Sequence, residues 1–378
     1  MDPMTGRERL TNILAGQPNE RLVWTTLVDD VTRSVMPPEV RRLHVLDFYR
    51  HVGCDILQFG DYGLPAEDRP ISPAALRQPV RTVRSESDGL VTRATVSQWG
   101  ELTASWRSGH PVTYPVETLA DLEVLTRIWA HSRYEEVQDS RPEESLRRVE
   151  ERIGDDGLYV ATTAPSPVQQ LIEGDLGLER FCYFLQDHPR QMEELLAAMH
   201  RCRVQEYEIL ARRTAAPAIV PVENTSSTLT SPSMYRQLSL PQIAEYARIV
   251  HKHGRKFILH MCGLLKGLLP VLKETHLDGI NGLTPPTVGD TPYEAALDAL
   301  GEGLILLGAG FPGQVFQKPG ATAGEIQSTL DSLDTPRLRR ARLLLWMGAD
   351  GLPTPLERFL AVREWMDRHG GPTTQTGS

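Results

Sequence analysis

Residues 218–263 read AIVPVENTSSTLTSPSMYRQLSLPQIAEYARIVHKHGRKFILHMCG, which is an apolar run, a polar loop, a helical pattern and a second apolar run. The runs Ala218 to Val222 and Lys256 to Leu259 are short and apolar, as buried strands are. Between them, Pro232 to His253 has helical spacing and begins with proline, which is tolerated in a first helical turn. This order predicts a β-α-β unit with two parallel strands.

The same alternation extends over most of the 378 residues. Eight apolar runs alternate with helical patterns, and the count of eight favours closure into a barrel over an open sheet. We therefore predict an α/β fold, a (β/α)8 TIM barrel. The eight predicted strands are Leu22 to Val28, Asp55 to Phe59, Leu158 to Thr162, Ala218 to Val222, Lys256 to Leu259, Asp278 to Ile280, Leu304 to Leu307 and Leu343 to Trp346.

Three segments lie outside this alternation. The N-terminal segment is predicted to form an amphipathic helix, with Thr5 and Glu8 at the spacing of a capping box. Residues 80–107 contain two alternating strands around Asp88-Gly89, which predicts a β-hairpin inserted into the barrel. Residues 371–378 have no periodicity and are predicted to be disordered. Residues 1–370 are therefore expected to form one domain.

Composition excludes several classes of function. There are 40 Lys and Arg against 49 Asp and Glu, a net charge of −9, so the chain has no basic surface for nucleic acid. It has four cysteines and no CxxC motif, which indicates a reducing compartment. Without a signal peptide or an apolar run of about 18 residues, the sequence predicts a cytoplasmic protein that does not enter a membrane.

In an α/β barrel, the catalytic groups follow the C-terminal ends of the strands. The first predicted strand ends at Asp29 and Asp30, which are suited to proton transfer or to capping a helix. The fifth ends at His260-Met261-Cys262. In an extended chain residues i and i+2 point the same way, so His260 and Cys262 can approach one ion, and both are typical zinc donors. A buried thiol and a hydrogen-bonded histidine are the alternative.

The segment from Glu223 to Gly263 resembles the uroporphyrinogen decarboxylase-like superfamily. The matching positions are Thr230-Ser231-Pro232 with Tyr235, the turn Lys252-His253-Gly254, and His260 to Gly263. Weaker similarity covers most of the chain, including the final GADGLPTPLERFLAVREW. The resemblance implies one (β/α)8 barrel.

The resemblance also implies an activity. The porphyrinogen decarboxylases carry an Arg-rich N-terminal motif, which is missing at Arg21 to Leu27. The branch of zinc-dependent methyltransferases, which act on thiols or corrinoid proteins, holds zinc with HxC and a later Cys. His260 and Cys262 match the first two ligands, and Ala349 stands where the later Cys would be. Glu223 is the first candidate for the third ligand, followed by Asp350.

This comparison predicts a methyltransferase in which zinc activates a thiol, or a methylated substrate, and in which any corrinoid belongs to a separate protein. Glu223 could instead be a hydrogen-bond acceptor or base. The alternatives are a metal-free decarboxylase or lyase of a small carboxylated substrate, with proton transfer by His260 and Asp29 or Asp30, and a non-catalytic binding subunit. A homodimer is left open. The candidate substrate contacts are Trp24, Tyr62, Asn224, Asn281 and Phe311.

Overall fold

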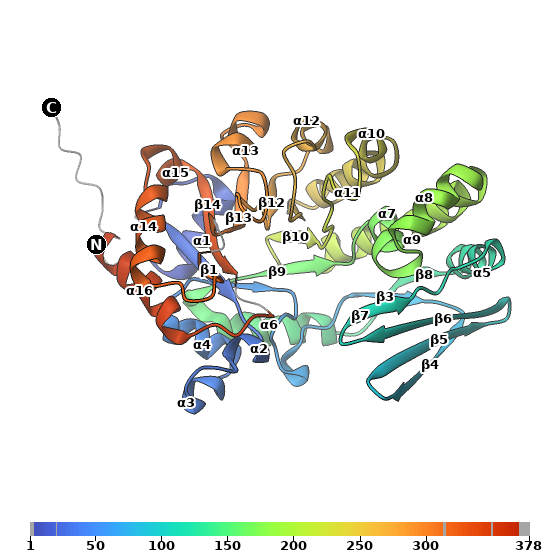
Figure 1. The fold of residues 1–378 in the computed structure, drawn as a ribbon, viewed down its shortest axis with the longest axis horizontal. Coiled ribbons are helices and arrows are strands. Elements are labelled where there is room, and N and C mark those ends of the chain that lie inside the picture. Colours follow the sequence, from blue (N-terminus) through green and yellow to red (C-terminus); the bar gives the residue numbers. More distant parts are fainter. Residues whose placement is uncertain (1–3, 20, 313–314, 349–350, 370–378) are drawn as a thin grey trace.

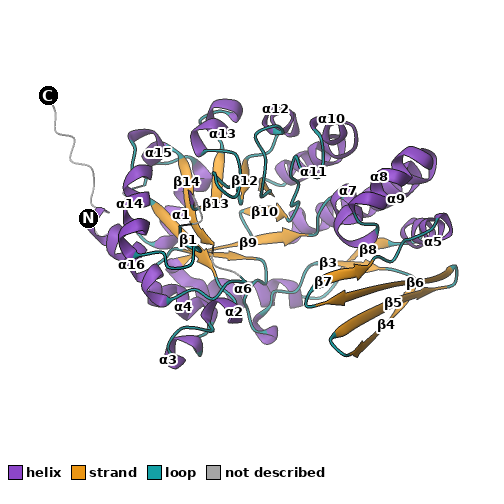
Figure 2. Cartoon of the chain, viewed as in Figure 1, coloured by secondary structure: helices purple, strands orange, loops and turns teal. Residues whose placement is uncertain are grey.

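The computed structural model describes residues 4–19, 21–312, 315–348 and 351–369. Eight parallel strands form one sheet in the order β1-β14-β13-β12-β11-β10-β9-β2. The backbone N–H of Asp55, just before β2, donates to the carbonyl of Trp24 in β1 at 3.0 Å, so the two edges of the sheet meet. The predicted (β/α)8 barrel is confirmed, and Figure 2 shows its strands surrounded by helices. These strands are β1 (Val23–Leu27), β2 (Ile56–Phe59), β9 (Gly157–Thr163), β10 (Ala218–Pro221), β11 (Lys256–His260), β12 (Gly279–Asn281), β13 (Ile305–Gly310) and β14 (Arg342–Gly348).

Strand alternation divides the core into two parts. The barrel interior contains Val160, Val220, Ile258 and Leu307. Their neighbours along the strands point outward and pack against the helices in a larger outer core. The helices are α1 (Gly6–Ala15), α2 (Asp30–Arg33), α3 (Pro38–Arg41), α4 (Val45–Val52), α5 (Leu119–Ala130), α6 (Arg141–Ile153), α7 (Pro167–Gln170), α8 (Leu178–Asp187), α9 (Pro189–Arg213), α10 (Pro232–Met234), α11 (Leu240–Lys252), α12 (Leu269–Leu272), α13 (Tyr293–Leu300), α14 (Ala323–Leu333), α15 (Pro336–Arg340) and α16 (Leu356–His369).

Helix α1 closes the N-terminal end of the barrel. Its Leu10, Ile13 and Leu14 are buried in the same cluster as the interior strand residues. The predicted capping box is present, because the Thr5 side chain accepts from the Glu8 N–H and the Glu8 carboxylate accepts from the Thr5 N–H. The amphipathic pattern of α1 therefore serves to seal the barrel at the end opposite to the strand ends where catalytic groups are expected.

The inserted segment is larger than the predicted hairpin. Four antiparallel strands form a meander around the expected turn at Asp88-Gly89. A further pair of strands, β3 and β8, joins this insertion to the barrel. Figure 1 shows the insertion beyond the C-terminal end of β9. Four of these six strands were not predicted: β3, β7 and β8 are only four residues long, and β6 falls inside the segment that was assigned to two strands. The strands are β3 (Ala74–Arg77), β4 (Val80–Ser87), β5 (Leu90–Ser97), β6 (Gly100–Arg107), β7 (His110–Thr113) and β8 (Arg133–Glu136).

Two helices contain π-helical turns instead of running regularly. The predicted helix from Pro232 to His253 divides into α10, the π-helix η4 (Tyr235–Ser239) and α11. The π-helix η3 (Leu171–Asp175) follows α7 in the same way. Single π-helical turns are rare and occur frequently at functional sites. The short 3-10 helices are η1 (Ala66–Asp68), η2 (Gly154–Asp156) and η5 (Lys273–Thr275).

The predicted disordered tail, residues 371–378, lies outside the described residues. Among the helices of the described chain, none is both long and apolar enough to cross a bilayer.

Candidate active site at the C-terminal mouth of the barrel

His260 is the last residue of β11, and its ring is held by Asn281, the last residue of β12. The two residues are paired in register, and Asn281 Oδ1 lies 2.5 Å from His260 Nδ1. The Asn281 Nδ2 group donates to the carbonyl oxygen of Leu307 at 2.5 Å. Because that carbonyl can only accept, the amide oxygen must face the histidine. In the neutral ring Nδ1 therefore carries the proton, and Nε2 is left as the basic nitrogen.

The backbone of Gly282 packs closely against the imidazole ring of His260. Gly282 has φ +79°, in the left-handed region, and a Cβ built there would lie 2.9 Å from His260 Cε1. A side chain at this position would therefore displace the imidazole. The ring of Phe59, at the end of β2, lies 6.1 Å from that of His260 between centroids. Asn281, Gly282 and Phe59 together restrict the ring to one orientation.

Cys262 follows two residues after His260 and is exposed at the mouth of the barrel. It lines a cavity of about 240 Å³ together with Thr284, Phe311 and Trp346. Its Sγ lies 3.9 Å from Asn224 Oδ1. The thiol thus faces a partly apolar cavity at the strand ends, where substrates bind in this fold.

Glu223 follows β10 and is completely buried. Its carboxylate accepts hydrogen bonds from the Ser166 N–H at 2.7 Å, from the Ser166 hydroxyl at 2.7 Å and from the Thr225 hydroxyl at 3.3 Å. Burial raises the pKa of Glu223 from 4.5 to about 7, although these hydrogen bonds lower it. Burial thus brings the pKa of this carboxyl close to neutral pH.

Two of the three predicted zinc donors lie at the end of the same strand. The basic Nε2 of His260 and the Sγ of Cys262 have the chemistry of zinc ligands and lie at one mouth. The oxygens of Glu223 are instead occupied by Ser166 and Thr225. In the described part of the chain, no group of three His, Cys, Asp or Glu residues is placed to hold a metal. Zinc binding stays a prediction, and Ala349 and Asp350 lie outside the described residues.

The two predicted acids after β1 have other contacts. Asp29 caps α2: its Oδ1 accepts from the Thr32 N–H at 2.7 Å, and its Oδ2 accepts from the Gly351 N–H at 2.9 Å. The Asp29 pKa is lowered, because these hydrogen bonds outweigh desolvation by burial. Asp30 is exposed and pairs with Arg33. Of the two roles left open for this pair, helix capping is seen for Asp29, and catalysis stays a prediction for both.

The predicted substrate contacts divide into two groups. Phe311 lines the mouth cavity, and Asn224 and Asn281 contact Cys262 and His260. Trp24 is completely buried in the outer core, so its expected place in the substrate cavity is wrong. The physical reason is strand alternation, which turns residue 24 outward when Val23 points inward. Tyr62 follows β2 and is partly exposed, and its contact with substrate stays a prediction.

Two residues of the site were missed from the sequence. Trp346 lines the mouth cavity from β14. Counting by two from the interior residue Leu344 would have found it. Ser166, which holds Glu223 and caps α7, follows a predicted strand end, but its contact with Glu223 gives no local signal because the two residues are 57 positions apart.

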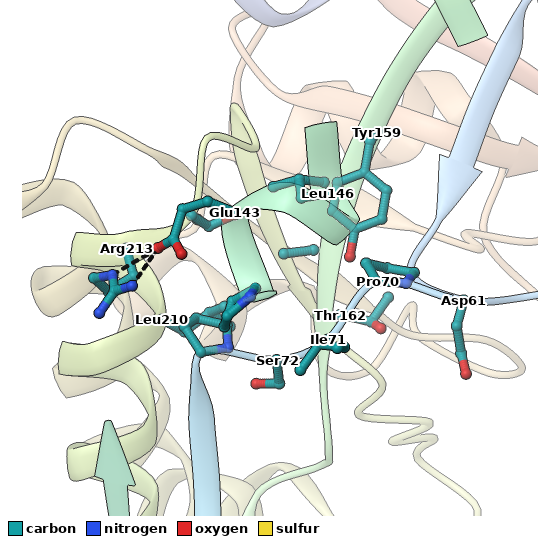
Figure 3. A pocket seen from close by; sticks show the side chains of 15 residues that line it. Asp61, Pro70, Ile71, Ser72, Glu143, Leu146, Tyr159, Thr162, Leu210 and Arg213 are labelled. Carbon is teal, nitrogen blue, oxygen red and sulfur yellow. Dashed lines mark hydrogen bonds and ion pairs between the residues drawn. The ribbon is translucent and has the colours of Figure 1, made fainter. Parts of the chain in front are cut away.

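A second cavity, of about 180 Å³, lies outside the barrel between β9 and the helices α6 and α9. Figure 3 shows Tyr159 pointing into this space and the ion pair between Arg213 and Glu143 at its edge. Neither His260 nor Cys262 lines it. The combination of an oriented imidazole and a thiol therefore favours the barrel mouth as the candidate active site.

Comparisons with known proteins agree with this architecture. No curated protein sequence matches the chain. A solved structure described as "methyltransferase from Methanosarcina mazei" superposes with a TM-score of 0.58 and 15% sequence identity, over 97% of this chain and 99% of that one. At this identity the likeness shows the fold alone. Residues 108–337, more than half of the chain, match the family described as "Uroporphyrinogen decarboxylase (URO-D)". The chain belongs to the uroporphyrinogen decarboxylase (URO-D) family.

Proposed function

We propose that this protein transfers a methyl group between a small methylated substrate and a thiol or a separate corrinoid protein. The observation that carries the proposal is that His260, held at Nδ1 by Asn281, ends β11, and that Cys262, two residues later, lines the mouth cavity. Family membership and the fold shared with a protein named as a methyltransferase support it. A decarboxylase that clamps several carboxylates would need a cluster of arginines, which the segment Arg21 to Leu27 does not supply.

The chain's own residues prepare the site for such a reaction. Asn281 accepts from Nδ1 of His260, so Nε2 is the basic nitrogen of the neutral ring, and Gly282 leaves space for the ring. Phe311 and Trp346 give the cavity an apolar wall that suits a methyl group. When bound by His260 and Cys262, zinc would supply Lewis acidity and would lower the pKa of a coordinated thiol.

We propose a positioning role for Glu223. Its contacts fix Ser166 and Thr225, which lie on the loops after β9 and β10. Its backbone N–H also donates to the carbonyl of His260 at 3.1 Å. Glu223 thereby joins the ends of three neighbouring strands, and a role as third zinc ligand would require it to give up these hydrogen bonds.

A second candidate function is a metal-free lyase or decarboxylase. The observation that favours it is the hydrogen bond from His260 Nδ1 to Asn281, since in the neutral ring Nε2 could then act as a general base without any metal. In that case His260 would move the proton, with Asp29 or Asp30 as the alternative acid. A non-catalytic binding subunit is the third outcome that an experiment must distinguish.

The decisive experiment is metal analysis of protein purified without chelator. The proposal predicts about one zinc per chain in the unaltered protein. His260→Ala and Cys262→Ser should both lose the metal. Cys182→Ser, which changes an exposed thiol on α8, is the matched control and should keep it.

Activity is measured in the same four proteins as thiol-dependent demethylation of methylcobalamin, followed by absorbance. The proposal predicts turnover in the unaltered protein and in Cys182→Ser only. Metal-free protein without turnover would contradict methyl transfer. Demethylation that survives Cys262→Ser would contradict the role proposed for the Cys262 thiol. A corrinoid partner and a homodimer are tested in parallel by co-purification and by light scattering.

A further inference from the structure

A third cavity, of about 240 Å³, lies between the inserted sheet and the helical layer of the barrel. One wall is apolar and includes Leu102 from β6 and Trp129 from α5. The other carries charged and polar groups: Arg93 from β5, and Gln170 and Asp175 from the turn formed by α7 and η3. None of its lining residues belongs to the cavity at the barrel mouth.

Within the part of the chain that the structure describes, the Asp175 carboxylate accepts a hydrogen bond from one side chain. Gln170 Nε2 donates to Asp175 Oδ2 at 3.1 Å, and Gln170 Oε1 accepts from Arg203 Nη2 at 2.8 Å. The arginine fixes the orientation of the amide, because a guanidinium can only donate. Burial raises the pKa of Asp175 to about 6. The hydrogen bond from Gln170 and the charges of Arg93 and Arg203 lower this pKa, but by less than burial raises it. Within the described residues, Asp175 forms no ion pair.

Arg93 supplies the opposite charge without neutralising Asp175. Its guanidinium lies over the ring of Trp106 at 5.0 Å from the centroid. Its charge acts on the Asp175 carboxyl across the cavity. The two side chains nevertheless form no salt bridge in the described structure, so their charged groups lie more than 4.0 Å apart. A cation and an anion thus face one space and leave room between them.

We propose that this cavity binds a small zwitterion that carries both an amino group and a carboxylate, such as an amino acid. The ammonium group pairs with Asp175 and the carboxylate pairs with Arg93, while the side chain of the ligand contacts Leu102 and Trp129. A ligand with one charge would leave either Arg93 or Asp175 unpaired in a half-enclosed space, which is unfavourable. The volume lies below the 300–1,000 Å³ that is roughly typical of drug-sized ligands. This proposal is independent of the proposed methyl transfer.

The test is calorimetric titration of the full chain with compounds that differ in charge only, at constant ionic strength. L-Leucine carries both groups, isoamylamine carries the amine and 4-methylpentanoate carries the carboxylate. We expect saturable binding of leucine, and at least about tenfold weaker binding of the two single-charge compounds, since each loses one charge-assisted contact.

Variants identify the site. Asp175→Asn and Arg93→Gln should each weaken leucine binding by about 10- to 100-fold. Thr95→Leu, which fills the cavity and keeps both charges, should also abolish binding. The matched controls are Arg84→Gln and Asp88→Asn, on exposed parts of the same sheet, and should bind like the unaltered protein. Each variant's circular dichroism and urea midpoint show that it is folded.

Three results would overturn the proposal. The first is absence of leucine binding up to about 10 mM in the folded, unaltered protein, which is weaker than a specific site provides. The second is equal binding of 4-methylpentanoate and leucine, which would indicate a simple anion site at Arg93. The third is unchanged leucine binding in both Asp175→Asn and Thr95→Leu, which would place the ligand elsewhere.

Discussion

Removing the side chain of Asn281 should release the ring of His260 and destabilise the barrel. Asn281 is 5% exposed and makes two hydrogen bonds, one to His260 Nδ1 and one to the carbonyl of Leu307. That carbonyl lies where the pairing of β13 with β14 shifts register, between Leu307 and Ala309. In Asn281→Ala both partners lose a buried contact. An unsatisfied buried group costs about 1–3 kcal/mol, so we expect a loss of about 2–4 kcal/mol in the free energy of unfolding.

Two measurements check this expectation. Urea denaturation gives the stability, and correlation of ring protons with ¹⁵N in the histidine side chains gives the tautomer of His260. The chain has eleven histidines, so His260→Ala is needed to assign the signal. In the unaltered protein the proton should be on Nδ1, and in Asn281→Ala the Nε2–H form should become populated.

Asn281→Asp separates the two effects of this substitution. A carboxylate can accept from Nδ1–H but cannot donate to the Leu307 carbonyl, so the tautomer should be kept while stability is lost. Asn12→Ala, at the N-terminal end of the barrel, is the control and should leave the His260 signal unchanged. If Asn281→Ala keeps the Nδ1–H form and loses less than about 0.5 kcal/mol, Asn281 does not orient the ring, and the proposed basic Nε2 loses its structural support.

Three further substitutions test other parts of the structure. Leu10→Ala, in the helix that closes the barrel, should lower the free energy of unfolding in urea by about 2–5 kcal/mol; a loss under about 1 kcal/mol would show that α1 is not a plug. Gly282→Ala should cost about 1–2 kcal/mol and shift the His260 ring signal, because it combines a left-handed backbone with a contact of 2.9 Å; an unshifted signal would contradict the close packing. Asp175 has its pKa raised from 3.8 to about 6, so its stabilising contribution is present at low pH and is lost as pH rises through 6. A pKa shift changes the free energy of unfolding by about 1.36 kcal/mol per pKa unit, which gives about 3 kcal/mol for a fully buried carboxyl. Because Asp175 is partly exposed, we expect about half of this value. Asp175→Asn should therefore gain stability relative to the unaltered protein between pH 4 and 8, and a pH-independent difference in urea denaturation would refute the raised pKa.

The strand pattern was predictable because buried parallel strands are continuous apolar runs with polar ends. All eight predicted barrel strands are present, and His260 and Cys262 lie at the mouth as the HxC spacing indicates. The inserted sheet was underestimated, since β3, β7 and β8 have only four residues each, too few to show an alternating pattern. Trp24 was misplaced because composition alone does not show which face of a strand points into the barrel.

The sequence by itself determined the barrel, the helix that caps it, and the position of an imidazole and a thiol at one strand end, because these follow from local periodicity and i to i+2 geometry. The tertiary structure decided which hydrogen bonds the side chains of the site make. It turned Glu223 toward Ser166, 57 residues away, and placed Asn281 so that it sets the tautomer of His260. It also brought Arg93 and Asp175 to one cavity from segments 82 positions apart in the chain. Such contacts depend on the register and packing of distant elements, which no local pattern contains.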